Sequence, residues 1–379
     1  MKEISMNHLP APTWNWLHVN DRQIALPEEV KTAVIMTEQL PDGVKVTGIP
    51  EQACEQDIDE CWKANAEQVK LGDQKNNDML ASMGLDEIEM SAGKAVDAYV
   101  KDASVNTVLY KVESGVKVSE PLRIKYDYSS PENAAAMTKT VIELGENAEL
   151  NLVCLMTGSK GYGVSDTRIR AAAGAKLNLV HVYLTEESQH ILSTIGGCYE
   201  DAAGLQLIEV VTGSSDLTIG CQADLNGKRS YLNIDTGYYM EQDGMLDVNY
   251  VARHRGCDTD SKIIVNGALK DRATKNFRGT IDFIKGCKGA KGDEREDILL
   301  IDDKVHNRTV PLILCAEEDV EGGHGASIGK LSDEVRFYFQ SRGISEEEIV
   351  DLMARARIDA VAGRIPDEVT RKLILNTEE

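Results

Sequence analysis

The sequence is poor in positive charge and in aromatic residues. Its 379 residues include 41 Lys and Arg against 63 Asp and Glu, which gives a formal net charge of -22. A surface this acidic repels a phosphate backbone, and no basic block interrupts it, so we expect no direct binding to nucleic acid. Only 5% of the residues are aromatic, but 42% are hydrophobic, which is enough for a sizeable core.

Long apolar runs and a targeting segment are also missing. No run approaches the roughly 20 residues that cross a bilayer, and residues 1–8 lack the apolar core of a signal peptide. The sequence therefore predicts a cytoplasmic protein without membrane contact. The nucleotide-binding pattern G-x-x-x-x-G-K-[ST] does not occur, so we expect no ATP hydrolysis by a P-loop of this chain.

The cysteines do not form a recognisable cluster motif. Eight are present, but none forms a C-x-x-C pair, which excludes a zinc ribbon and a ferredoxin-type motif. In a reducing compartment we expect most of them to be buried thiols. Cys257 differs because it lies in a turn beside His254 and Arg255, two cationic groups that would lower its pKa. It is our candidate for a reactive thiol.

From about residue 107 the sequence alternates apolar and polar residues with many β-branched side chains, as strands with one buried face do. A glycine followed by a short alternating strand recurs at intervals of roughly 17 to 30 residues, which is typical of a solenoid. These glycines are Gly145, Gly174, Gly204, Gly227 and Gly244. The recurrence favours a parallel β-helix over the alternative, an antiparallel sandwich or jelly roll, because few two-residue hairpin turns are present.

Helical patterns flank this region on both sides. Residues 51–71 carry apolar residues every three to four positions, and a second helix is expected at about 86–97. After residue 330, a capping box that begins at Ser345 predicts one helix, and Pro366 is placed to occupy the first position of another. We therefore predict a mainly β protein with a helical (α/β) domain at 1–100, a β-helix core at 101–330 and a C-terminal helical domain at 331–379.

One stretch concentrates metal-binding side chains. Cys315 ends an apolar run, four carboxylates follow it, among them Glu318, and His324 lies between glycines. Sulfur, oxygen and imidazole donors within about ten residues form a ligand set that suits iron or zinc. The alternatives are that His324 is an ordinary surface residue of a glycine-rich turn and that Cys315 only packs in a core.

The same stretch resembles a known family. Residues 318–320 (Glu-Asp-Val), 324–327 (His-Gly-Ala-Ser), 337–339 (Phe-Tyr-Phe) and 341–344 (Ser-Arg-Gly-Ile) are similar, in this order, to the signature of the SufB/SufD family of iron-sulfur cluster assembly proteins. The segment 276–281 (Asn-Phe-Arg-Gly-Thr-Ile) resembles the family's strand just upstream. The form His-Gly-Ala is more like SufD than SufB.

The resemblance implies a right-handed parallel β-helix between helical domains, which pairs with a second β-helix and binds the ABC ATPase SufC through its C-terminal region. The implied function is that of a scaffold or SufD-type subunit, not an enzyme. Iron and a transient iron-sulfur cluster would be held at the interface of the two β-helices. The partner chain would be a second copy or a SufB-like paralogue, and the sequence leaves both open.

The resemblance also implies roles for single residues. His324 matches the family's interface histidine, a candidate ligand for iron or the cluster, whereas Glu296 stands where SufB chains carry an interface cysteine. Either the chain never holds sulfur there, or Cys315 supplies the thiol from a neighbouring strand. Cys315, a carboxylate (Glu296 or Glu318) and His324 from each of two chains would form a labile site. Glu296 could equally be an exposed charge. Under the resemblance, Cys257 is the candidate for receiving sulfur.

Two other classes of function remain possible. A β-helix enzyme would be an acyltransferase, which needs a regular six-residue repeat, or a lyase, which needs clustered basic residues; the sequence shows neither pattern. A purely structural adaptor of an ATPase would need no metal chemistry. The adaptor differs from the scaffold in whether His324 and Cys315 matter for cluster content.

Overall fold

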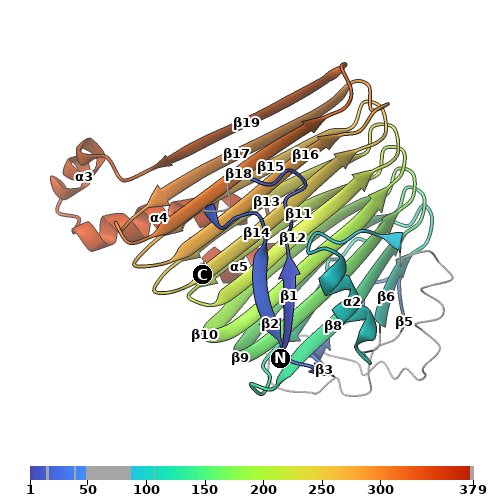
Figure 1. The fold of residues 1–379 in the computed structure, drawn as a ribbon, viewed down its shortest axis with the longest axis horizontal. Helices are drawn as coiled ribbons and strands as arrows, with labels where there is room; N and C mark the ends of the chain where they lie inside the picture. The colour runs from blue at the N-terminus through green and yellow to red at the C-terminus, as the bar shows by residue number, and fades with distance from the viewer. Residues whose placement is uncertain (14–16, 38–39, 48–86, 106, 376–379) are drawn as a thin grey trace.

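The computed structural model describes residues 1–13, 17–37, 40–47, 87–105 and 107–375. Most of them form long strands that coil in two sheets (Figure 1). From β11 to β17, each strand pairs in parallel with the strand two places later, as β11 does with β13 and β12 with β14. This pairing means that the chain alternates between the sheets and completes one coil with every two strands. The predicted parallel β-helix is confirmed.

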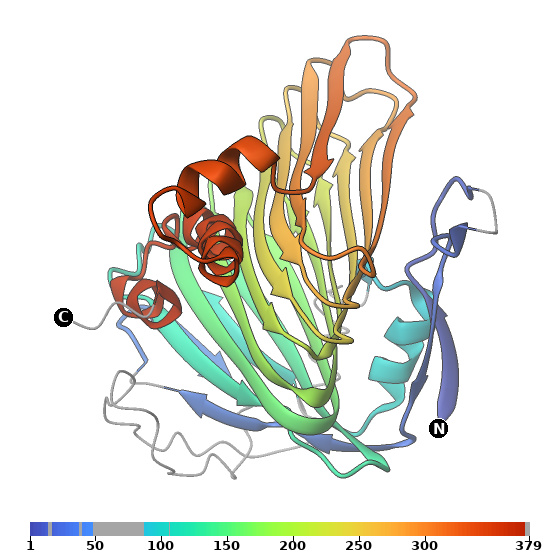
Figure 2. The same cartoon turned by 90° about the vertical axis from the view of Figure 1, so that its left-hand side faces the viewer.

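The two sheets share their two longest strands. The first sheet contains, in spatial order, β7 (Leu122–Asp127), the first halves of β9 (Glu149–Ala171) and β10 (Lys176–Tyr199), β11 (Gly204–Gly213), β13 (Tyr231–Met240), β15 (Asp260–Leu269), β17 (Ala290–Leu300) and β19 (Val320–Gly329). The second contains β8 (Ala134–Leu144), the second halves of β9 and β10, β12 (Asp216–Leu225), β14 (Met245–His254), β16 (Thr274–Phe283) and β18 (His306–Cys315). β9 and β10 therefore bend from one sheet into the other (Figure 2).

Each coil turns one corner with a residue in the left-handed conformation. Asp216 pairs with Met245 and Met245 with Thr274, so these coils take 29 residues each. At the corner, the backbone N–H of the left-handed residue donates a hydrogen bond to a backbone carbonyl oxygen in the corresponding corner of the next coil. These residues are Asn147, Gly174, Ala202, Arg229, Asp258 and Gly289, with φ between 55° and 73°. The five expected glycines do lie at or just before the starts of β9, β10, β11, β13 and β14, but of these only Gly174 is the left-handed residue of the corner. A single left-handed residue is not restricted to glycine, and Asn and Asp adopt it readily.

The core lies between the two sheets. In β14, Leu246, Val248, Tyr250 and Ala252 face inward and are at most 1% exposed. Such alternation repeats from coil to coil, and the inward-facing side chains form one continuous apolar cluster that extends to Ile298 of β17. Each fully buried Leu, Ile or Val contributes about 1.5 to 3 kcal/mol. The stacking of coils therefore stabilises the fold although no single coil has a core of its own.

The described part of residues 1–100 contains more strands than expected. It has β1 (Lys2–Met6), β2 (Arg22–Leu26), β3 (Glu29–Thr32), β4 (Val34–Thr37), β5 (Val44–Thr47) and one helix, α2 (Lys94–Asp102). β4 and β5 pair with β7 and with β6 (Thr107–Val112), so this segment extends the first coils instead of forming a separate helical layer. Short β-branched segments become strands where an edge is available to pair with them. The helix predicted at 51–71 lies outside the described residues.

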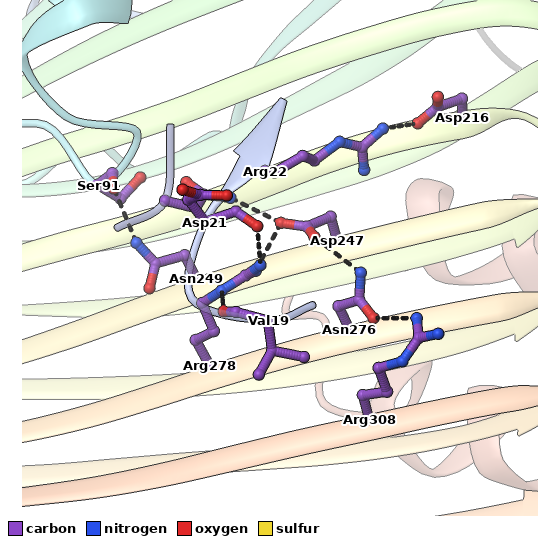
Figure 3. A network of polar contacts seen from close by, with 11 residues as sticks. Val19, Asp21, Arg22, Ser91, Asp216, Asp247, Asn249, Asn276, Arg278 and Arg308 are labelled. Carbon is purple, nitrogen blue, oxygen red and sulfur yellow. Dashed lines mark hydrogen bonds and ion pairs between the residues drawn. The ribbon is translucent and has the colours of Figure 1, made fainter. Parts of the chain in front are cut away.

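A buried polar network holds the N-terminal segment on the outer face of the second sheet (Figure 3). Arg278 of β16 donates to Asp247 of β14 and to the carbonyl oxygen of Val19, both at 2.7 Å. Asn7 donates to the same carboxylate at 2.7 Å. The side chains of Arg278 and Asp247 are both 0% exposed. A charge pair removed from water in this way tolerates no loss of a partner, so the network binds segments more than 200 positions apart.

Three helices follow the last strand: α3 (Asp333–Gln340), α4 (Glu346–Ala362) and α5 (Glu368–Leu375). Ser345 and Glu348 form the predicted capping box of α4, whereas α5 begins after Asp367, which caps it, and not at Pro366. Ile358 and Val361 of α4 pack on the outer face of the first sheet. α3 buries none of its residues and projects away from the strands (Figure 1). None of the helices in the described ranges is long and apolar enough to span a bilayer.

Candidate metal centre at the open end

The predicted ligands gather at one end of the β-helix, where the stacking of coils stops. β18 forms its ladder with β16 and β19 with β17, and no further coil in the described chain covers them (Figure 1). Ile313 and Ile328 pair in register with buried Ile281 and Ile298, yet they are 39% and 43% exposed. Inward-facing core positions are therefore left uncovered at this end. A surface of this kind favours association with another protein.

His324 lies in the middle of β19 and is exposed. It pairs in register with Glu294 of β17, whose side chain faces the interior. Paired residues of parallel strands present their side chains to the same face. The imidazole of His324 therefore lies on the interior side of the last coil. Of the alternative, the turn is wrong because His324 lies in a strand, but the residue is exposed as that alternative expects.

Cys315 is the last residue of β18 and is exposed, so the alternative of a buried packing residue is wrong. Its thiol donates to the carbonyl oxygen of Glu317 at 3.0 Å. Gly322 lies against Ile313, which fixes how β18 and β19 face each other. Cys315 lies two residues beyond Ile313, toward the turn that joins the strands, whereas His324 lies two residues beyond Gly322, away from that turn. The offset is four residues, about 13 Å along a strand, so the two side chains of one chain do not converge.

Glu296 is buried in the interior, with 3% of the residue exposed. Lys275 of β16 donates to its Oε1 atom at 2.6 Å, and neither side chain has exposed surface. Burial lowers the pKa of Lys275, and the Glu296 carboxylate opposes this shift. The alternative of an exposed charge is therefore wrong. The Oε2 atom of Glu296 has no hydrogen-bond partner, so one oxygen remains available to a ligand.

Glu294 is a second buried carboxylate that the sequence did not single out. It is 3% exposed, and burial followed by the nearby Glu296 raises its pKa to about 8. Glu294 lies one coil before His324 and 30 residues earlier in the sequence, and the two residues pair in register. This spacing was the only signal in the sequence, and it could have been read only with the register known.

The remaining candidates lie at the corner that precedes the first sheet. Glu318 is exposed in the turn between β18 and β19. Cys257 is partly exposed, and its thiol donates to the carbonyl oxygen of Gly286 at 3.4 Å. His254 is buried between Thr259 and Ser261, and burial lowers its pKa to about 4. His254 is thus neutral near pH 7, and of the two expected cations beside Cys257 only Arg255 remains.

Buried Cys287 occupies the same corner, between Cys257 and Cys315. Burial raises the pKa of its thiol, and both of the other thiols and Glu317 add to this effect. In the described chain, no three or more His, Cys, Asp and Glu side chains are arranged to hold a metal ion. The donor types suit iron, but a complete site needs ligands from a second chain, as the sequence-based hypothesis assumed.

Comparison with known proteins identifies the family. Residues 127–357 match the family described as "SUF system FeS cluster assembly, SufBD core domain". The chain belongs to the SufB/SufD family. The match runs from the last residue of β7 into α4, so it includes the whole open end and both ladders that lead to it. The limits that we predict for the domains, near residues 100 and 330, remain predictions.

Individual SufB/SufD proteins are similar to parts of this chain. Bacillus subtilis (strain 168) SufB is 24% identical over 281 residues, which are 71% of this chain and 60% of SufB. SufD of the same organism is 29% identical over 126 residues, 33% of this chain and 29% of SufD. A SufBD family protein of Mycobacterium tuberculosis (strain CDC 1551 / Oshkosh) is 28% identical over 132 residues, 35% of this chain and 16% of that protein. The chain therefore aligns with at most 60% of these relatives.

Proposed function

We propose that this SufB/SufD chain is the scaffold, or the SufD-type partner, of an iron-sulfur cluster assembly complex, in which a cluster is built where the open ends of two β-helices meet. The uncovered core positions of β18 and β19 are the observation that carries the proposal. Ile313 and Ile328 are exposed there, on the same interior side of the last coil as His324. Burying them against a second chain would bring two sets of ligands together.

The cluster is cargo in this proposal, and its ligands differ from the four thiolates of a stable protein-bound cluster. Each chain would contribute Cys315, His324 and a carboxylate, Glu296 or Glu318 in our sequence-based hypothesis. Mixed sulfur, nitrogen and oxygen ligation holds iron less firmly than four thiolates do. Such a site suits a cluster that is made and then passed on. Cys257, half-exposed at the corner, is the proposed first acceptor of sulfur.

The C-terminal helices are the proposed docking site of a SufC-like ABC ATPase in the cytoplasm. Phe337 and Tyr338 of α3 are 73% and 53% exposed. α4 anchors this region to the first sheet through Ile358 and Val361. A movement of the docked ATPase would therefore be transmitted to the β-helix. In this proposal the chain itself is not an enzyme.

The test is co-expression with the ABC ATPase of the same organism and anaerobic purification, followed by assays of iron, acid-labile sulfide and visible absorption. We expect a coloured complex, and we expect His324→Ala and Cys315→Ala to lose the cluster while the ATPase stays bound. His306→Ala is the control, because His306 is also an exposed histidine of the last coil but starts β18 far from the proposed site.

Each outcome has a defined meaning. A cluster formed without another scaffold chain would identify a homodimeric scaffold, and one that appears only with a SufB-like paralogue would identify a SufD-type partner. A colourless complex in every combination would leave an adaptor of the ATPase and would refute the scaffold. Failure to bind the ATPase would refute the docking proposal and return a β-helix transferase or lyase to consideration.

A further inference from the structure

A cavity of about 530 Å³ lies on the outer face of the second sheet. Outward-facing side chains of β12, β14 and β16 line its floor, and the chain segments around Pro10 and Met90 form its walls. Asn249 of β14 donates to the carbonyl oxygen of Ser91 at 2.8 Å and holds one wall against the sheet (Figure 3). Small-molecule ligands occupy cavities of about 300 to 1,000 Å³. The cavity is therefore large enough for a small organic molecule.

The charge in and around this cavity is unbalanced. The Nη1 atom of Arg253, on the floor, lies 2.8 Å from Glu89 and 3.4 Å from Asp224. Its Nε atom lies 3.6 Å from Asp282, which is longer than a hydrogen bond. Arg255 approaches Asp224 at 3.6 Å, so two guanidinium groups face three carboxylates. Burial raises the pKa of Asp224 and of Asp282. One further positive charge would balance the group.

Thr280 of β16 adds a polar group without a partner. The residue lines the cavity and is 2% exposed, and its hydroxyl oxygen has no hydrogen-bond partner in the described chain. It pairs in register with Val251 of β14, which also lines the cavity, and Ile88 and Met90 add further apolar surface. Buried hydroxyl groups nearly always have a partner, so an unpaired one indicates a bound group. A threonine hydroxyl can accept a hydrogen bond from a cationic N–H donor.

We infer that this cavity binds a small organic cation, an amine or guanidine carried on an apolar body. Asp282 and Thr280 lie two residues apart on the same face of β16, so one ligand can reach both. The cation would lie beside Asp282, the carboxylate that Arg253 pairs least closely, and the apolar side chains would cover the body. A bare metal ion fits less well, because no three His, Cys, Asp and Glu side chains of the described ranges are arranged to hold one. This binding site is separate from cluster assembly and does not depend on the proposed function.

The experiment is isothermal titration calorimetry of the full-length chain with n-hexylamine as the cationic probe and n-hexanol as its neutral analogue. We expect one hexylamine site per chain and at least about 10-fold weaker binding of hexanol, because the alcohol lacks the charge that Asp282 attracts. Asp282→Asn should weaken hexylamine binding about 10-fold and Thr280→Val about 5-fold, because each removes an acceptor. Asp293→Asn is the control and should bind as the wild type does, because Asp293 also lies beside an arginine, Arg295, but is exposed on β17 of the other sheet.

Thermal unfolding of the proteins without probe separates binding from a structural role. Thr280→Val replaces an unpaired buried hydroxyl with a methyl group, so we expect its Tm to equal or exceed that of the wild type. Asp282→Asn leaves Arg253 paired with Glu89 and should change the Tm little. A lowered Tm with unchanged hexylamine affinity would show that the altered residue is structural and would overturn the inference.

Three other results of the titration would also overturn the inference. The first is that hexylamine does not bind to the wild type, and the second is that hexanol binds equally well. The third is an equal loss of affinity in Asp293→Asn and Asp282→Asn, which would show only a general attraction of amines to an acidic surface. Because the titration contains neither the ATPase nor iron, none of these results bears on the proposed function.

Discussion

Asp247 offers the sharpest test of how the N-terminal segment is held on the β-helix. Its carboxylate accepts hydrogen bonds from Arg278 and Asn7 at 2.7 Å each and from Asn276 at 3.2 Å. Asp247→Asn keeps the shape but leaves the guanidinium of Arg278 buried without a counter-charge. Removing one partner of a buried ion pair costs about 3 to 5 kcal/mol. Because total stabilities are only about 5 to 15 kcal/mol, the loss should be large.

The assay is urea unfolding followed by circular dichroism, combined with limited proteolysis around Asn7, Val19 and Asp21, which the network holds. We expect a markedly lower midpoint for Asp247→Asn and earlier cleavage in this segment. Asp243→Asn is the matched control, because Asp243 also pairs with an arginine, Arg272, but both side chains are exposed. Exposed ion pairs contribute little. Equal midpoints for the two variants would refute the reasoning.

Three further predictions follow from the interior, the corners and the helices. Burial raises the pKa of Glu209 from an ordinary value of 4.5 to about 7, so the folded protein keeps the proton that the unfolded chain releases, and the stability of the fold decreases as the pH rises from 4.5 to 7. Urea midpoints measured from pH 5 to 8 should therefore fall less steeply in Glu209→Gln than in the wild type. Parallel curves for the two proteins would contradict this. A Cβ atom at Gly227 would meet the backbone nitrogen of Asp201 at 2.0 Å, so Gly227→Ala should lower the free energy of unfolding in urea by about 3 kcal/mol. Gly325→Ala, where the added Cβ atom meets open space, should leave it unchanged. Similar urea midpoints for the two variants would be evidence against tight packing at the corner. Phe337→Ser should leave the Tm unchanged but weaken co-purification with the ATPase, and full retention would remove α3 from the docking site.

The fold was predictable because its repeat is visible in the sequence. Each coil needs two strands with one buried face, so apolar residues alternate in every strand and the pattern recurs along the chain. The strands of the N-terminal region were not predicted, because segments as short as Val44–Thr47 are stabilised by the edge that they join. Strand propensity alone does not identify such segments.

The site was predictable only in part. His324 and Cys315 could be found because their residue types stand out next to glycines and carboxylates. Glu294 and the pair of Lys275 and Glu296 could not, because charged residues are almost always exposed and a sequence pattern assigns them to the surface. Their burial depends on which face of β16 and β17 turns inward, and that follows from the register of the whole stack.

The interior of the β-helix changes toward the open end, and this change bears on the proposed pairing of two chains there. The early and middle coils are filled mainly with Leu, Ile, Val and Tyr, with Glu209 and His181 buried among them, whereas the coil before the open end concentrates Lys275, Glu294 and Glu296. A purely apolar end layer would favour a permanent interface, since obligate interfaces resemble a divided core. An end layer that combines Ile313 and Ile328 with a charged layer behind it gains less from burial. If two chains pair here as proposed, we expect a contact that can open, which the release of a newly built cluster would require.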